Sequence, residues 1–322
     1  MARTALIFGV SGQDGSYLAR FLLDRGYDVH GTSRDCEIAS FRNLSILGIR
    51  DRVHVHSAAL HDSRSIVQVI RSVEPDEIYN LAAQSAVGLS FEQPVETIDS
   101  ILKGTLNILE AIRFLGVKTR FYHASSSESF GNILGEPASE DTAFRPCSPY
   151  GVAKSAAHWM VANYRQAYGL YACSGILFNH ESLLRPARFV TRKIVRGAIA
   201  VAQGRARTLE LGNLAVARDW GWAPEYVDAM WRMLQQDEPD DFVIATGRMY
   251  ALEDFVRTAF AHFGLDWREH VIQGAANLRP MDIHCSVGNP AKAAARLGWT
   301  AETLMPDLVS RLIEAELALP SP

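Results

Sequence analysis

The first half of the chain alternates short apolar runs with longer amphipathic stretches. The short runs are rich in β-branched and aromatic residues and predict strands. They cover Thr4–Phe8, Tyr27–Gly31, Arg52–His56, Glu77–Ala82, Arg120–Ala124 and Tyr171–Phe178. The amphipathic stretches predict helices at Ser16–Arg25, Ser63–Ser72, Val95–Leu115 and Ser148–Gly169. Because strands separated by helices are typical of βαβ units, we predict an α/β fold with a doubly wound parallel sheet of the Rossmann type.

The second half is less regular. After about residue 179 the segments become shorter, richer in arginine and less periodic. A helix at Glu225–Leu234 and a strand at Phe242–Ala245 indicate a return to the sheet, and a last helix is expected at Leu304–Leu319. We therefore predict a Rossmann domain of residues 1–178 and about 222–247. A smaller, mostly C-terminal substrate-binding lobe would hold about 179–221 and 248–322.

Composition narrows the possible partners. The 322 residues carry a formal net charge of −4, so there is no basic surplus to bind nucleic acid. No apolar run is long enough for a membrane span. The four cysteines are too few and too irregularly spaced for a zinc site or a disulfide framework, so we expect no metal and free thiols in a reducing cytoplasm.

Three glycines between the first strand and the first helix predict a dinucleotide site. Gly9, Gly12 and Gly15 form a Gly-x-x-Gly-x-x-Gly pattern in a strand–turn–helix context. Without side chains, the backbone can approach a pyrophosphate, which the free N–H groups of the helix N-terminus would face.

The end of the second strand bears on the choice of cofactor. An NAD enzyme usually has an acidic residue there to bind the ribose hydroxyls. Here Gly31 leaves room and Arg34 can meet a 2′-phosphate, which favours NADP. Asp35 argues against NADP unless its carboxylate points away, so NAD stays possible.

A tyrosine and a lysine predict redox chemistry on an alcohol. Tyr150 and Lys154 are spaced i and i+4, so they share one face of the helix at 148–169. A nearby ammonium and an oxidised nicotinamide both favour the phenolate, which can take the proton of a hydroxyl. If the chain stays extended after the strand at 120–124, Ser126 and Glu128 face one side and can serve as a hydrogen-bond donor and an acid–base group. The residues alone leave open a solvated polar loop.

These features resemble the extended short-chain dehydrogenase/reductases, and among them the GDP-mannose 4,6-dehydratase family. Blocks along nearly the whole chain carry the likeness. They lie at 9–19, 79–85, 126–128, 148–154, 175–182, 189–193, 211–214, 218–221, 279–280 and 288–290. The most specific are Asn-His-Glu-Ser at 179–182 and Arg-Asp-Trp-Gly at 218–221, whereas the glycine loop and the Tyr–Lys pair are shared by the whole superfamily.

The resemblance implies a role for each matching residue. It implies catalytic roles for Ser126, Glu128, Tyr150 and Lys154. It implies cofactor contacts at Gly9, Gly12, Gln13, Asp14, Gly15, Arg34, Leu81, Ala82, Ala83, Tyr150, Lys154 and His180. It implies substrate contacts at Gln84, Ser85, Asn179, Lys193, Arg218, Arg279 and Asp282. Among these, the cationic side chains suit the diphosphate of a GDP-sugar.

The implied reaction is an internal redox cycle. Tyr150 would take the C4 hydroxyl proton as hydride passes to NADP, and Glu128 would remove the C5 proton. The C6 hydroxyl would leave as water, and hydride would return to C6 to give GDP-4-keto-6-deoxymannose. The resemblance also implies a homodimer or homotetramer.

Departures from the family pattern keep alternatives open. Ala59 stands where the family usually has an aspartate near adenine, and Asp35 and Cys36 interrupt the usual arginine-rich loop. Asp282 replaces the usual glutamate after Arg-Pro. A dehydratase, epimerase or 4-ketoreductase acting on another GDP-sugar is therefore an alternative. A dinucleotide-binding regulator on the same fold is a further one.

Overall fold

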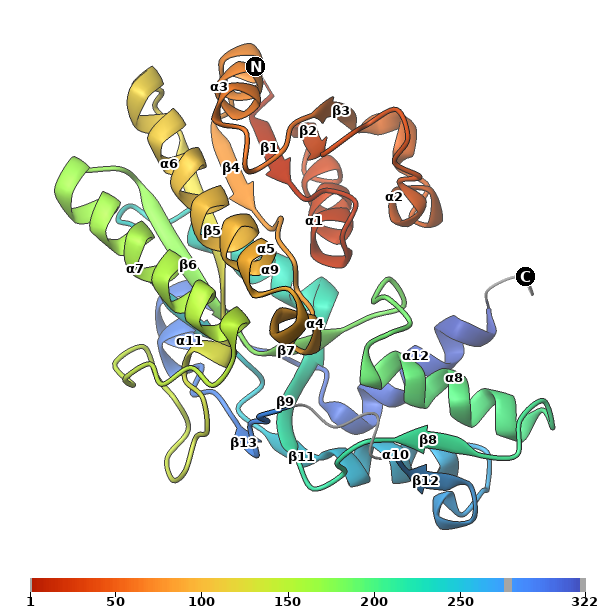
Figure 1. The fold of residues 1–322 in the computed structure, drawn as a ribbon. Helices are drawn as coiled ribbons and strands as arrows, with labels where there is room; N and C mark the ends of the chain where they lie inside the picture. The colour runs from red at the N-terminus through yellow and green to blue at the C-terminus, as the bar shows by residue number, and fades with distance from the viewer. Residues whose placement is uncertain (1, 275–279, 319–322) are drawn as a thin grey trace.

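A computed structural model describes residues 2–274 and 280–318. Within them, seven parallel strands form one sheet in the order β10-β6-β5-β4-β1-β2-β3 (Figure 1). These strands are β1 Thr4–Phe8, β2 Asp28–Ser33, β3 His54–Ser57, β4 Glu77–Asn80, β5 Arg120–Ser126, β6 Ala172–Leu177 and β10 Phe242–Ile244. Successive strands leave β1 first toward β3 and then toward β10, which confirms the predicted doubly wound α/β fold.

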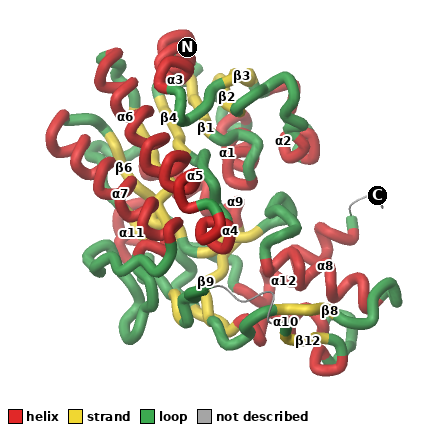
Figure 2. The backbone as a smooth tube through the Cα atoms, in the orientation of Figure 1, coloured by secondary structure: helices red, strands yellow, loops and turns green. Residues whose placement is uncertain are grey.

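Helices cover both faces of the sheet (Figure 2). They include α1 Gln13–Leu23, α3 Ser63–Val73, α6 Gly104–Leu115, α7 Pro149–Tyr168 and α9 Ala223–Met233. Side chains alternate along each strand, so Ala5 and Ile7 of β1 pack with α1 and α9, whereas Leu6 and Phe8 pack with α3 and α6. All four are fully buried, which explains why the strand reads as one apolar run.

A second group of elements lies beside the carboxyl ends of these strands (Figure 1). Its strands are β7 Asn179–Glu181, β8 Leu209–Leu211, β9 Ala217–Trp222, β11 Met249–Ala251, β12 Val271–Gln273 and β13 Cys285–Ser286. Its helices are α8 Val190–Ala202, α10 Leu252–Ala261 and α12 Met305–Leu317, which share one apolar core. Strand β9 is the hub, because it pairs with β7, β11 and β13. The boundaries that we predicted for the two domains stay a prediction.

Several short elements complete the described chain. They are α2 Arg42–Ile46, α4 Val87–Glu92, α5 Pro94–Ile98 and α11 Ala291–Leu297, with 3₁₀ turns at Arg50–Arg52, Ser127–Ser129 and Trp267–Glu269. The helix expected over Val95–Leu115 is α5 and α6 joined by a π-helical stretch at Asp99–Lys103. Such stretches widen a helix locally and often lie near functional sites. This one contacts α7, the helix that carries Tyr150.

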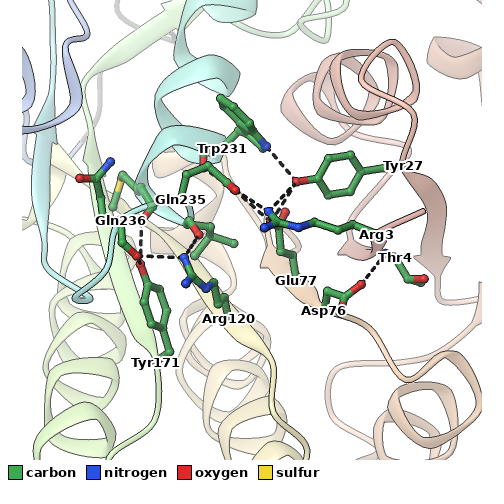
Figure 3. A network of polar contacts seen from close by, with 12 residues as sticks. Arg3, Thr4, Tyr27, Asp76, Glu77, Arg120, Tyr171, Trp231, Gln235 and Gln236 are labelled. Atoms are coloured by element: carbon green, nitrogen blue, oxygen red, sulfur yellow. Dashed lines mark hydrogen bonds and ion pairs between the residues drawn. The ribbon is translucent and has the colours of Figure 1, made fainter. Parts of the chain in front are cut away.

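A polar network fixes the amino ends of the central strands (Figure 3). The carboxylate of Glu77 is buried and accepts hydrogen bonds from Tyr79 at 2.8 Å, from Tyr27 at 3.0 Å and from Gln235 of the α9 end at 3.0 Å. Arg3 lies 3.4 Å from the same carboxylate. A buried charge needs such partners, and these contacts join the amino ends of the central strands to the segment that follows α9.

Among the described residues, no helix combines the length and the apolar character that crossing a membrane requires.

Candidate active site

The glycine loop has the geometry of a dinucleotide cradle. Gly9 has a φ of +86°, and a Cβ there would fall 2.8 Å from the Cα of Ala82. A Cβ on Gly15 would fall against the Gly9 oxygen and 2.8 Å from the Cα of Val10. The Gly12 N–H donates to the Gly9 oxygen at 3.0 Å, and Gly12 stands at the N-terminus of α1. Only glycine fits at positions 9 and 15, and the loop leads into the N-terminus of α1, so it suits the close approach of a pyrophosphate.

A cavity of about 870 Å³ opens at the carboxyl ends of the parallel strands, where α/β proteins bind ligands. Its wall brings together many of the predicted site residues. They are Asp14, Leu81, Ser85, Ser126, Glu128, Tyr150, Lys154, Asn179, His180, Lys193, Arg218 and Asp282. Cofactor and substrate candidates therefore share one cavity. Within the described residues, no cluster of His, Cys, Asp or Glu is arranged to hold a metal ion.

The start of α7 places the Tyr–Lys pair in this cavity. Ser148 caps the helix by accepting the Gly151 N–H at 3.0 Å. Tyr150 and Lys154 are both 8% exposed. The Lys154 ammonium donates to the backbone oxygen of Ala124 at 2.6 Å and lies 5.8 Å from the centre of the Tyr150 ring. The lysine is thus anchored to β5, beside the phenol.

The protein alone holds this tyrosine in its protonated form. Burial raises the pKa of Tyr150 to about 12, the charge of Glu128 adds to the increase, and a hydrogen bond with Ser126 opposes it. Burial lowers the pKa of Lys154 to about 8, against the opposing charge of Asp14. We predicted that a nearby ammonium and an oxidised nicotinamide together favour the phenolate. That stays a prediction, and in the protein alone burial is the largest influence on the pKa of Tyr150. A nicotinamide in its oxidised form, when bound, supplies the additional positive charge and carries the hydride.

Glu128 reaches the cavity by a different route from the one we expected. The chain does not stay extended after β5, which was the condition for Ser126 and Glu128 to face one side, because residues Ser127–Ser129 form a 3₁₀ turn. Ser126 caps this turn by accepting the Glu128 N–H at 3.2 Å. The turn still directs half-buried Glu128 to the cavity wall beside Tyr150. A hydroxyl, a phenol, an amine and a carboxyl group therefore converge on one region.

Asp14 and His180 form a buried ion pair between α1 and β7. Their side chains meet at 2.9 Å, and the other ring nitrogen of His180 lies 2.7 Å from the backbone oxygen of Phe178. Burial disfavours both charges, yet the mutual attraction lowers the pKa of Asp14 and raises the pKa of His180. The histidine ring also stacks on Tyr226 at 4.6 Å between centres. The acid in the glycine loop is thus neutralised by a protein cation.

Sequence reasoning missed Arg185 and Glu181, which also line the cavity. The buried Glu181 carboxylate accepts a hydrogen bond from Thr191 at 2.7 Å and lies 3.4 Å from the Arg185 guanidinium. The Arg185 guanidinium also stacks over Phe189 at 4.0 Å. Its charge lowers the pKa of Asp14, so it lies near the glycine loop. The sequence signal that could have identified Arg185 is a cationic residue three positions after the Asn-His-Glu-Ser block.

The far end of the cavity is built on β9. Arg218 lines it and lies 3.2 Å from Asp282. The next residue, Asp219, is fully buried and accepts hydrogen bonds from the Thr246 hydroxyl at 2.6 Å and the Gly247 N–H at 2.9 Å. It therefore fixes the strand that presents Arg218. Lys193 and Asn179 reach the same wall from α8 and β7.

Other predicted residues are not on this wall. Gln84 turns its amide to the Ala86 oxygen at 2.9 Å, and Gln13 is buried against Ser182. Ala82 and Ala83 follow β4 beside the glycine loop, and Arg34 directly follows β2. Arg279 lies outside the described residues. These assignments, like the roles of the wall residues, stay predictions.

The fold and the site together define an extended short-chain dehydrogenase/reductase: a glycine-loop dinucleotide cradle, a Tyr–Lys pair and a lobe over the carboxyl edge of one parallel sheet. The solved UDP-glucose 4-epimerase of Thermus thermophilus, in complex with NAD, aligns with a TM-score of 0.86 over 98% of this chain and 100% of its own, at 25% identity. The Pseudomonas aeruginosa protein RMD, complexed with NADPH, aligns with a TM-score of 0.80 over 98% of this chain and 97% of its own, at 22% identity.

The sequence then specifies the family. The family model described as GDP-mannose 4,6 dehydratase matches residues 6–312. A GDP-mannose 4,6-dehydratase from Vibrio cholerae is 43% identical over 353 aligned positions, which cover 98% of this chain and 94% of that protein. The chain belongs to the GDP-mannose 4,6-dehydratase family, which confirms the resemblance and the prediction of a hydro-lyase of nucleotide-sugar metabolism.

Proposed function

We propose that the chain converts GDP-mannose to GDP-4-keto-6-deoxymannose by removing one water. Support comes from family membership and from one observation on the site. The cavity that holds Tyr150 and Lys154 also holds a carboxyl group, Glu128, next to the hydroxyl of Ser126. A simple ketone reductase needs the tyrosine and the lysine, but elimination of water also needs an acid–base group at the neighbouring carbon.

Each side chain has a defined task in this mechanism. Tyr150 accepts the proton of the C4 hydroxyl, aided by the Lys154 charge and by a hydrogen bond from Ser126. The resulting C4 ketone acidifies C5–H, which Glu128 removes. Glu128 then delivers that proton to the departing C6 hydroxyl, which leaves as water. Return of the hydride to C6 and of a proton to C5 would complete the product. Asn179, Lys193 and Arg218 bind the GDP portion, and the two cations, Lys193 and Arg218, neutralise the diphosphate.

The direct test is incubation of the purified protein with NADP and a panel of GDP-sugars. We expect GDP-mannose to lose the mass of one water without added reductant. Consumption of NADPH in step with product would instead indicate a 4-ketoreductase. Turnover of another GDP-sugar alone would correct the substrate. Binding without turnover of any sugar would favour the regulator.

We propose NADP as the cofactor. The solved structural relatives contain NAD or NADPH, so a nicotinamide dinucleotide is the shared feature. In this chain Arg34 follows β2 directly, and the Asp35 carboxylate accepts the backbone N–H of Glu37 at 2.9 Å. Because the aspartate is engaged in its own turn, it does not need to oppose a 2′-phosphate at Arg34. Titrations with NADP and NAD under matched conditions test this choice, and equal affinity would contradict it.

We also propose that the chain forms a homodimer or homotetramer, and a cytoplasmic location stays a prediction. Large apolar side chains are exposed on the outer faces of α6 and α7, namely Phe114, Val152, Trp159 and Tyr168. Helices α6 and α7 lie side by side (Figure 1), so these residues favour burial against another copy. Trp159→Glu should shift the protein toward the monomer in analytical ultracentrifugation. An unchanged mass would exclude this face.

A further inference from the structure

A buried amide joins the glycine loop to the segment that follows β7. Gln13 is 6% exposed and Ser182 is fully buried. The Gln13 amide nitrogen donates to the backbone oxygen of His180 at 3.2 Å and to Asp14 at 2.9 Å. Its oxygen accepts the Ser182 hydroxyl at 2.8 Å. Both hydrogens and the oxygen of the amide therefore have partners, which is the condition for a rigid buried network.

The Asp14–His180 ion pair runs parallel to this bridge. It joins the same two segments at 2.9 Å, and the His180 ring is held from behind by Phe178 and Tyr226. Residues more than 160 positions apart in sequence are thus tied together at two adjacent points. A single contact would leave a hinge, whereas two adjacent bridges fix the spacing between α1 and β7.

This spacing matters because both segments border the ligand cavity. Asp14 belongs to the loop that fits a pyrophosphate, and Asn179 and His180 of β7 line the same cavity. The reaction proposed above takes hydride from a sugar and returns it to the same sugar. The reduced cofactor must therefore stay bound between oxidation at C4 and reduction at C6.

We propose that Gln13 and Ser182 are positioning residues that form a latch, which retains the reduced cofactor through the hydride cycle. The latch acts by holding the glycine loop against β7, and neither side chain lies on the described cavity wall. The expected loss of hydride during turnover rests on the proposed function, whereas the expected change in the dissociation rate of the cofactor does not. Two separate measurements can therefore test it.

The first measurement is the dissociation rate of NADPH, followed by its fluorescence with no sugar present. Ser182→Ala leaves the Gln13 oxygen without its donor, and Gln13→Met keeps the length of the side chain but removes the amide. We expect each variant to release NADPH faster by on the order of tenfold, the effect of one unsatisfied buried hydrogen-bonding group. The effect of the double variant should be less than additive, because both substitutions remove the Gln13–Ser182 bond, while Ser182→Ala also removes the acceptor of the Leu184 N–H at 3.1 Å.

The second measurement is the fate of the hydride during turnover. In a leaking variant, GDP-mannose and NADP give the 4-keto sugar, free NADPH and a proton, so electrons balance without dehydration. We expect NADPH in solution in proportion to oxidised, undehydrated sugar, and a lower kcat with little change in the KM for GDP-mannose. The wild-type protein should release almost none.

Ser16→Ala is the matched control. Ser16 lies in the same helix start, is fully buried and donates to the Val10 oxygen at 2.9 Å, within the loop itself. It should lose similar thermal stability without releasing NADPH faster. Wild-type NADPH retention in Ser182→Ala and Gln13→Met, or equal acceleration in Ser16→Ala, would overturn the latch. A wild-type protein that does not dehydrate GDP-mannose would overturn the proposed function, while the dissociation rates still decide the latch.

Discussion

Lys154 is expected to set the alkaline limit of activity. Burial lowers the pKa of its ammonium to about 8, and the charge of Asp14 only partly offsets this. One pKa unit is a tenfold ratio, so the ammonium is charged in about 90% of molecules near pH 7 and in about 10% near pH 9. Turnover at saturating GDP-mannose and NADP should therefore fall roughly tenfold over that interval, if the charge beside Tyr150 is required.

The direction in which activity changes at alkaline pH distinguishes the titration of Lys154 from other causes of the change. Titration of Tyr150 toward the phenolate would make activity rise with pH, the opposite trend. The folded protein binds the Lys154 proton less tightly than the unfolded chain does, so this group adds stability as pH rises from about 8 toward 10.5. Loss of activity in this range is therefore not loss of the fold through Lys154.

The assay is the rate of product formation across the pH range, with Lys154→Arg as the comparison. A guanidinium stays charged throughout, so the alkaline limb should move upward in this variant. Each profile is scaled to its own maximum, because the larger head group lowers the absolute rate. The thermal midpoint, measured at each pH, controls for unfolding. A wild-type profile that stays flat to about pH 10, or identical limbs in both proteins, would refute the reasoning.

Three further predictions address the acid, the cradle and the cofactor. Glu128→Gln should still bind nucleotide and oxidise C4. Formation of the dehydrated product, measured by mass, should drop by a factor on the order of 100 or more, the usual contribution of an acid–base group. Dehydration at the normal rate would show that the role assigned to Glu128 is wrong. Gly15→Ala should lose nucleotide binding or fold poorly, because the new methyl group meets the Gly9 oxygen and the Val10 backbone, and a normal thermal midpoint with normal NADP affinity would contradict this. Arg34→Ala should weaken NADP by about 1.5–3 kcal/mol, as expected for a charged hydrogen bond, and leave NAD unchanged in calorimetric titrations; equal weakening of both would place Arg34 elsewhere.

Most of the parallel sheet could be predicted from the sequence because its signals are local. The strand β1 is an apolar run that ends at a glycine, and the bounds of β1 are the same in prediction and structure. Helix α7 has a serine cap, a proline at its first position and a terminal glycine, and its predicted ends differ from the observed ends by one residue. Each of these signals is encoded within a few residues.

The lobe could not be predicted in the same detail because its strands are short and depend on distant partners. Strand β9 pairs with β7, β11 and β13, and the turn that precedes β11 is fixed by the Asp219 carboxylate. Strands β7, β8 and β12 have three residues each, too few to show a period of two. The sequence therefore indicated a lobe but not its pairing.

The residues of the candidate site also differ in whether their sequence signals are local. Tyr150, Lys154 and the three glycines follow from local spacing, and Ser126 and Glu128 gain weight from the family resemblance. The partners that control their charges do not follow from spacing: Asp14 meets His180 across 166 positions of sequence. Burial is equally non-local, yet it is the largest influence on the pKa values of Tyr150 and Lys154. The roles assigned to these residues stay predictions, and their protonation in the protein alone depends on burial, which residue spacing does not reveal.

The structure gives the Asn-His-Glu-Ser block a physical meaning that its sequence alone does not have. Its second and fourth residues hold the glycine loop, and its third holds Arg185 and the start of α8. The side chains of three residues in four thus contact other protein segments, and substrate binding by Asn179 stays a prediction. A substitution in this block should disturb the retention of the cofactor before it disturbs the affinity for the sugar. A reaction that transfers hydride to the cofactor and back to the same sugar requires this retention, because the reduced cofactor must stay bound until the elimination step is complete.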